Sequence, residues 1–179
     1  WTAGLALQSL GALSRVWTRA GYEEDARELD HFLARMKSDF RTHIIRDGVV
    51  AGFALFAGDT CTPLLHPSDG ETGIHYRLLP INRAIISGQF TPEEVEFHLD
   101  LVQRHLKFPD GVRLMDRSPQ YRGGTSVHFQ RAETAAHFGR EIGLMYVHAN
   151  IRYCEALAKV GRAEELLEML QVISPVAIA

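Results

Sequence analysis

The segment from Phe108 to Tyr153, FPDGVRLMDRSPQYRGGTSVHFQRAETAAHFGREIGLMYVHANIRY, joins an arginine-rich stretch to an apolar helical pattern. The polar part carries Arg113, Asp116, Arg117, Arg122, His128, Arg131 and Glu133, and the helical part still carries His137, Arg140, Glu141 and His148. An unpaired charge inside an apolar helix is very costly, so these charges need partners. Several arginines beside one helix predict a place that holds an anion or a polyhydroxylated ligand.

The composition is that of a globular protein. Of the 179 residues, 46% are hydrophobic and 23% are charged. A chain of this length can bury a hydrophobic core, so we expect residues 1–179 to form a single unit. A net charge of −3 argues against general nucleic-acid binding. No apolar run approaches the ~18 residues that span a bilayer, so we expect no membrane segment. Cys61 and Cys154 make neither a disulfide scaffold nor a zinc cluster, which favours a cytoplasmic setting.

Helical periodicity dominates the chain, and it predicts a mainly α architecture of packed helical hairpins with short β segments and long loops. Expected helices are Thr2–Ala20, Glu23–Ile45, Pro80–Ser87, Pro92–Leu106 after a Thr91 capping box, a long helix from between Ala132 and His137 to Gly161, and Arg162–Ile173. Expected extended segments are Val49–Phe56 and Gly111–Met115, with loops at Gly58–Thr72 and Ser118–Ser126. A helical repeat array is the rival, but no copies recur at a fixed period.

The chain starts within a helical pattern, because Trp1 has no capping residue ahead of it. We therefore expect a piece of a longer protein. In such a piece, helices that lack their partners would expose apolar side chains, such as those of Leu5, Leu7 and Leu10. Exposed apolar patches favour self-association, so we expect an oligomer.

Two places are candidates for an anion site. His75, Tyr76 and Arg77 lie between a glycine-rich loop and a helix start, where the positive end of the helix attracts anions. Pairing of Arg77 with Asp69 or Glu71 is the purely structural alternative. The second candidate is Gly139-Arg140-Glu141 in the predicted long helix. It indicates either a ligand clamp or close packing of a neighbouring helix.

Metal and nucleophile chemistry are not favoured. The spacing of His98 with His105, and of His137 with His148, does not let two rings of one helix reach one zinc ion. The chain has no Gly-x-Ser-x-Gly elbow and no P-loop. Only Asp116, Glu133 and Glu141 are carboxylates among the unusual residues, and periodicity does not choose among them.

Three strings resemble the cellobiose-phosphorylase-type glycoside family (glycoside hydrolase family 94). They are RDGVVAGFALF, TPLLHPSDGETGIHYRLLPINRAIISGQFTPE, and FPDGVRLMDRSPQYRGG followed by FQRAETAAHFGREIGLMYVHANIRY. Within that family they are most similar to 1,2-β-oligoglucan phosphorylases and to the C-terminal module of cyclic β-1,2-glucan synthases. The resemblance extends from Trp1 to Pro175.

This resemblance implies an (α/α)6 barrel that cleaves β-glucosidic bonds, such as those of β-1,2-glucan, with inorganic phosphate. The reaction inverts the anomeric centre, releases α-glucose 1-phosphate, and needs no cofactor besides the phosphate co-substrate. In the family a Trp-Asn-Asp-Gly-like motif carries the general acid, shortly before a helix that opens with a Trp like Trp1. No such motif occurs here. The chain is therefore expected to be the C-terminal part of the barrel and inactive alone.

The resemblance also implies site residues. Phosphate would be bound by Arg77 with His75 beside it, and by Gly139-Arg140, where many relatives have Thr-Gly. Sugar would be bound by Tyr76, Arg113, Asp116, Arg117, Tyr121, Arg122, His128 and Glu141. Two alternatives remain: a non-catalytic helical module for carbohydrate binding or protein interaction, and hydrolysis, which requires a second carboxylate to activate water.

Overall fold

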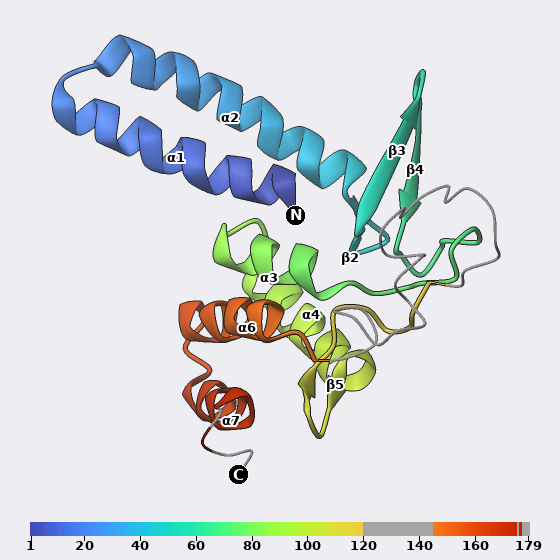
Figure 1. Ribbon diagram of the computed structural model, residues 1–179. Coiled ribbons are helices and arrows are strands. Elements are labelled where there is room, and N and C mark those ends of the chain that lie inside the picture. The colour runs from blue at the N-terminus through green and yellow to red at the C-terminus, as the bar shows by residue number, and fades with distance from the viewer. Residues whose placement is uncertain (120–144, 175, 177–179) are drawn as a thin grey trace.

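The computed structural model describes residues 1–119, 145–174 and 176, and these residues are mainly helical (Figure 1). The described helices are α1 (Thr2–Ala20), α2 (Glu23–His43), α3 (Leu78–Ile86), α4 (Pro92–His105), α6 (Val147–Lys159) and α7 (Ala163–Ile173). The described strands are β1 (Ile45–Arg46), β2 (Val49–Val50), β3 (Phe53–Ala57), β4 (Thr60–Leu64), β5 (Lys107–Phe108) and β6 (Gly111–Val112). They pair as three two-stranded antiparallel sheets, β1–β2, β3–β4 and β5–β6. The predicted mainly α class is confirmed.

Helices α1 and α2 form an antiparallel hairpin at one end of the described structure (Figure 1). Gly21 ends α1 with φ 87°, a left-handed conformation that glycine adopts without steric cost. Between the helices, the Ser14 hydroxyl donates a 2.6 Å hydrogen bond to Asp30 Oδ1. Leu7 is only 3% exposed, so it does not belong to an exposed stripe as predicted, whereas Val16 further along α1 is 58% exposed.

The connection from α2 into the sheets differs from the sequence prediction. Helix α2 ends at His43 instead of Ile45, because Ile45 already pairs with Val50 across the β1–β2 hairpin. Asp47 and Gly48 form the turn between β1 and β2, with φ values of 48° and 78°. These positive values explain why Asp and Gly occupy the turn.

The predicted loop Gly58–Thr72 contains a strand. Residues Thr60–Leu64 form β4, which pairs along its whole length with β3. Pro63 and the polar residues around it concealed this strand from a sequence reading. Pro63 stands opposite Ala54 in a two-stranded hairpin, where proline is tolerated because each strand is also an edge.

The core lies where α3 packs against α6 and α1, with α7 packed on the outside of α6. Each of these helices contributes apolar side chains at helical spacing. The fully buried members include Ile74, Leu78, Ile81, Val102, Leu106, Tyr153 and Leu157. Because α3 is buried along its length, the segment that precedes it is fixed in position against the core.

The capping box predicted at the start of α4 is confirmed. The backbone N–H of Glu94 donates to Thr91 Oγ1 at 3.3 Å, and Glu94 Oε2 accepts the Thr91 N–H at 2.9 Å. Arg41 of α2 pairs with the same Glu94 carboxylate at 2.6 Å. The cap therefore also ties α4 to the first hairpin.

The predicted long helix ending at Gly161 is not continuous. Met145 forms an antiparallel bridge with Arg113, and Tyr146 is extended at φ −106° and ψ 108°, so α6 begins only at Val147. The buried Asn150 side chain accepts the Val112 N–H at 2.9 Å and donates to the Val112 carbonyl at 2.7 Å. Pairing with β6 competes with helix formation here and fixes the start of α6.

Candidate functional site

Two segments far apart in sequence pair directly before α3. An antiparallel bridge joins Arg77 to Met115, and the Leu78 N–H donates to the Leu114 carbonyl at 2.9 Å. One step further along, the Asp116 N–H donates to the Tyr76 carbonyl at 3.3 Å. This pairing brings six of the predicted site residues to one place: His75, Tyr76, Arg77, Arg113, Asp116 and Arg117.

Arg77 occupies the N-cap position of α3 with extended backbone angles, φ −133° and ψ 128°. Its Nε atom is buried and has no hydrogen-bond partner among the described residues. Burial lowers the pKa of the Arg77 guanidinium, which nevertheless stays protonated at neutral pH. The carboxylate of Asp69, one of the partners that the sequence raised for Arg77, accepts instead from Leu65, Glu71 and Thr72. A buried cation with an open donor is suited to bind an anion.

The start of α3 offers few free backbone N–H groups that could bind an anion together with Arg77. Pro80 has no N–H, and the N–H of Leu78 is used by Leu114. Of the first three residues of α3, Leu79 alone keeps a backbone N–H that no described residue accepts. The helix dipole still favours negative charge here, but the side chains must supply most of the directed hydrogen bonds.

The Asp116 carboxylate contacts backbone and side-chain groups of several neighbouring residues. Its side chain is 9% exposed. Oδ1 accepts the backbone N–H groups of His75 at 2.9 Å and Tyr76 at 3.0 Å. Oδ2 lies 3.5 Å from His75 Nδ1 and 3.4 Å from Arg117 Nε. At most one of the two Asp116 oxygens, Oδ2, is therefore left to accept a sugar hydroxyl, which is the role predicted for this residue.

Tyr76 stacks on His105, the last residue of α4, with ring centroids 4.4 Å apart and an interplanar angle of 22°. One face of the tyrosine is therefore covered by the imidazole, and a sugar ring would have only the other. Sequence reasoning considered His105 only as a partner of His98 for metal. Its position on the last turn of a helix gave no signal that it lies against the segment before α3.

Arg113 is held by its own hairpin. Its guanidinium carbon lies 3.8 Å from the centroid of the Phe108 ring, and one of its nitrogens lies 3.7 Å from Asp110. The Arg113 Nε atom is buried without a described partner. The Phe108 ring and Asp110 therefore hold the Arg113 guanidinium in a defined direction on this hairpin.

The loop before this segment is built on Asp69. Its carboxylate accepts the backbone N–H groups of Leu65, Glu71 and Thr72 and the Thr72 hydroxyl, at 2.5 to 3.0 Å. Burial raises the pKa of Asp69, but these hydrogen bonds outweigh burial and hold that pKa below its ordinary value. The neighbouring His66 is 1% exposed, and its Nε2 lies 2.9 Å from the Arg46 carbonyl. This loop is therefore rigidly built where it leads toward His75.

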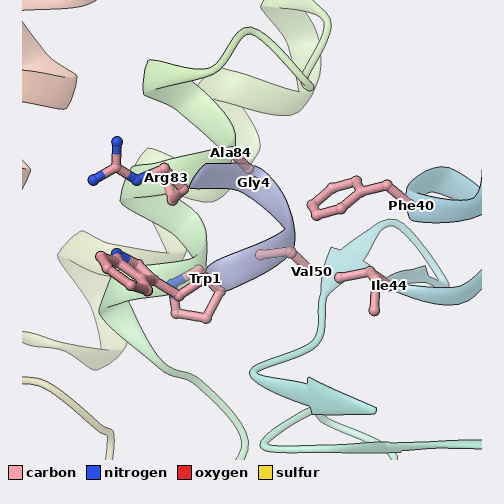
Figure 2. A pocket seen from close by; sticks show the side chains of 8 residues that line it. Trp1, Gly4, Phe40, Ile44, Val50, Arg83 and Ala84 are labelled. Atoms are coloured by element: carbon pink, nitrogen blue, oxygen red, sulfur yellow. The ribbon is translucent and has the colours of Figure 1, made fainter. Parts of the chain in front are cut away.

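A second buried arginine, Arg83 in α3, was not predicted. It is 5% exposed, donates to Gln8 Oε1, and lies 5.5 Å from the Trp1 ring centroid. A small cavity of about 10 Å³, room for roughly one water molecule, lies beside it. Figure 2 shows Phe40 and Val50 on one side of this cavity and Trp1 and Arg83 on the other, with the guanidinium turned away from Phe40.

The remaining predicted site residues are Tyr121, Arg122, His128, Gly139, Arg140 and Glu141, and they lie outside the described residues. Within residues 1–119 and 145–174, no group of three or more His, Cys, Asp or Glu residues is placed to hold a metal ion. Cys61 and Cys154 are free thiols. No helix in the described part of the chain is both long and apolar enough to cross a bilayer.

No family model matches the chain. The chain is, however, 40% identical over 180 aligned residues, 99% of its own length, to a 1,2-beta-oligoglucan phosphorylase of Listeria innocua serovar 6a. The resemblance predicted from the sequence is confirmed. The chain spans 16% of the length of this phosphorylase relative. Because the alignment takes in nearly the whole chain, it includes both segments that pair before α3.

Proposed function

We propose that this chain is part of an inverting β-glucan phosphorylase, acting on β-1,2-glucan, and that it contributes Arg77 and His75 to the phosphate site. The similarity to a 1,2-beta-oligoglucan phosphorylase supports the reaction class. The structural observation that carries the site is the half-buried, charged Arg77 side chain, whose Nε atom is buried without a described hydrogen-bond partner. Gly139 and Arg140 belong to the same proposal, from the resemblance alone.

In phosphorolysis the phosphate oxygen attacks the anomeric carbon while an acid protonates the departing glycosidic oxygen. Phosphate takes the place of the second carboxylate that a hydrolase needs. The protein must hold the dianion in line with the bond that breaks, and oriented cationic donors supply that positioning. Arg77 offers a planar donor, and His75 lies two residues before it on the same fixed segment.

Neither Asp69 nor Asp116 is well suited to be the general acid. Donors occupy both oxygens of Asp69, and the low pKa of this carboxyl opposes the protonated form that an acid needs. Oδ1 of Asp116 already accepts two N–H groups. We therefore propose that another part of the polypeptide supplies the acid and that this chain alone is inactive.

The test is glucose 1-phosphate release from β-1,2-linked gluco-oligosaccharides by the longer polypeptide, with and without inorganic phosphate. We expect release only with phosphate, and Arg77→Ala should raise the phosphate KM by roughly 10–100-fold while the glucan KM changes little. Arg104→Ala is the matched control, because Arg104 is 55% exposed and pairs with Asp100 within its own helix.

Three results would contradict the proposal. An unchanged phosphate KM in Arg77→Ala would remove Arg77 from the site. Release of free glucose without phosphate would indicate hydrolysis. No release under either condition would favour a non-catalytic carbohydrate-binding or protein-interaction module.

A further inference from the structure

The contacts of Asp116 are those of a group that holds other groups in place. Its side chain is 9% exposed, and its Oδ1 accepts two consecutive backbone N–H groups, those of His75 and Tyr76. Its own N–H donates to the Tyr76 carbonyl, so side chain and backbone fix the same two residues. A carboxylate meant for a sugar hydroxyl would instead keep its oxygens free toward the ligand.

The second oxygen of Asp116 faces His75. Oδ2 lies 3.5 Å from His75 Nδ1, the distance of an ion pair when the ring is protonated. A carboxylate on one ring nitrogen of histidine orients the ring and leaves the other nitrogen for a ligand. Here that other nitrogen is Nε2 of a side chain that is 35% exposed.

The backbone on both sides of Arg77 is fixed as well. Before it, Asp116 binds Tyr76, and after it, the Leu78 N–H is held by Leu114. The direction in which the Arg77 side chain leaves the backbone is therefore set by the 114–116 segment. Within that segment, Asp116 holds the neighbouring backbone with its side chain, whereas Leu114 does so through its backbone carbonyl.

We propose that Asp116 is a positioning residue, which orients His75 and Arg77 toward an anionic co-substrate and does not itself bind sugar. This inference rests on the proposed function, since it names what prepares the proposed phosphate site. The neighbouring cation Arg117, whose Nε lies 3.4 Å from Oδ2, balances the carboxylate charge. The net charge near the co-substrate thereby stays positive despite a buried carboxylate.

Two variants separate the charge of Asp116 from its hydrogen bonds. Asp116→Asn keeps an oxygen that can accept the two N–H groups but removes the charge, and Asp116→Ala removes both. Asp100→Asn is the matched control. Asp100 is 56% exposed and pairs with Arg104 within its own helix.

The experiment measures initial rates of the longer polypeptide at neutral pH in two series. In one, phosphate is varied with saturating β-1,2-gluco-oligosaccharide, and in the other, the oligosaccharide is varied with saturating phosphate. Asp116→Ala should raise the phosphate KM by roughly 10–100-fold with little change in the glucan KM, since misplaced cations weaken anion positioning. Asp116→Asn should raise the phosphate KM less than Asp116→Ala does, because the amide oxygen can still accept the two N–H groups. Asp100→Asn should match the wild type.

The outcomes separate this inference from the proposed function. If wild-type release depends on phosphate while both Asp116 variants keep the wild-type phosphate KM, the positioning role is refuted alone. A raised glucan KM with an unchanged phosphate KM would assign Asp116 to the sugar and refute it too. Wild-type release that does not need phosphate would overturn the proposed function and this inference together. If Asp116→Ala does not fold, Asp116→Asn decides.

Discussion

Lowering the pH should destabilise this protein through one buried histidine, His98. Its side chain is fully buried in α4, and Nδ1 lies 2.7 Å from the Glu94 carbonyl, to which it donates. Nε2 accepts the backbone N–H of Val50 at 3.2 Å, and the ring stacks on Phe90 with centroids 4.0 Å apart. Both nitrogens of the neutral ring are thereby satisfied. If Nε2 were protonated, two hydrogen-bond donors, Nε2–H and the Val50 N–H, would face each other. The hydrogen bond that joins α4 to β2 would then be lost.

The sign of the effect follows from where the proton binds. Burial lowers the pKa of His98 below its ordinary value of 6.5, although the Glu94 carbonyl and carboxylate favour the charged form. Below pH 6.5 the unfolded chain therefore takes up a proton that the folded chain refuses. The free energy of unfolding should then fall with decreasing pH, by up to about 1.4 kcal/mol per pH unit for this one proton. Above pH 6.5 this group should contribute no slope.

The charged groups near His98 act outside this window. The pKa of Glu94 is lowered, first by its hydrogen bond from Arg41, from an ordinary value of 4.5. A carboxyl group with a lowered pKa destabilises the fold only as the pH falls below its ordinary value. Between pH 5.0 and 6.5 the slope due to His98 is therefore separable from that due to Glu94.

Urea unfolding followed by far-ultraviolet circular dichroism, at pH 5.0 to 7.5 and constant ionic strength, measures this slope. His98→Gln keeps an acceptor for Val50 but does not titrate, so its stability should depend less on pH between 5.0 and 6.5, by the slope of one proton. His31→Gln, at an exposed position on α2, is the control and should keep the wild-type slope. Identical slopes for wild type and His98→Gln would refute the reasoning.

Two further changes should alter stability in predictable directions. Gly4→Ala should lower the free energy of unfolding by roughly 1–3 kcal/mol, because a Cβ there would lie 2.8 Å from a side-chain carbon of α3. Gly11→Ala in the same helix meets only an ordinary contact at 3.8 Å and should raise it by about 1 kcal/mol. Urea unfolding of the pair checks the contrast, and equal signs would contradict it. Asn150→Ala should cost roughly 2–4 kcal/mol, since it leaves the buried N–H and carbonyl of one β6 residue unpaired. A loss below 0.5 kcal/mol in thermal or urea unfolding would contradict that role.

Local signals in the sequence predicted most of the helices. The Thr91 capping box and Gly21 after α1 mark helix ends by chemistry that acts within one turn, and the structure shows both. The start of α6 is different, because its residues also fit a helix that begins earlier. What decides it is the bridge between Met145 and Arg113, a contact between residues far apart in the chain. Periodicity carries no information about such pairing.

The candidate site shows the same division. The sequence drew attention to Arg77 and Asp116 as unusual charged residues, and the structure places them on paired segments. The sequence did not show that one Asp116 oxygen accepts backbone N–H groups, nor that His105 covers one face of Tyr76. Those facts depend on side-chain direction after the two segments have met. A pattern of residue types can therefore locate a site before it can assign roles within it.

The buried arginines bear on why the site has its present form. Among the described residues, the Nε atoms of Arg77, Arg83 and Arg113 are buried without a hydrogen-bond partner. Leaving a buried donor unsatisfied costs about 1–3 kcal/mol, and apolar side chains of similar size usually serve a core at least as well. The unsatisfied Nε of Arg77 is therefore a cost to stability that an apolar side chain would not carry. A cation kept unpaired beside a rigid backbone is, by contrast, what the binding of an anion requires, because the cost of orienting it is met in folding rather than at each turnover.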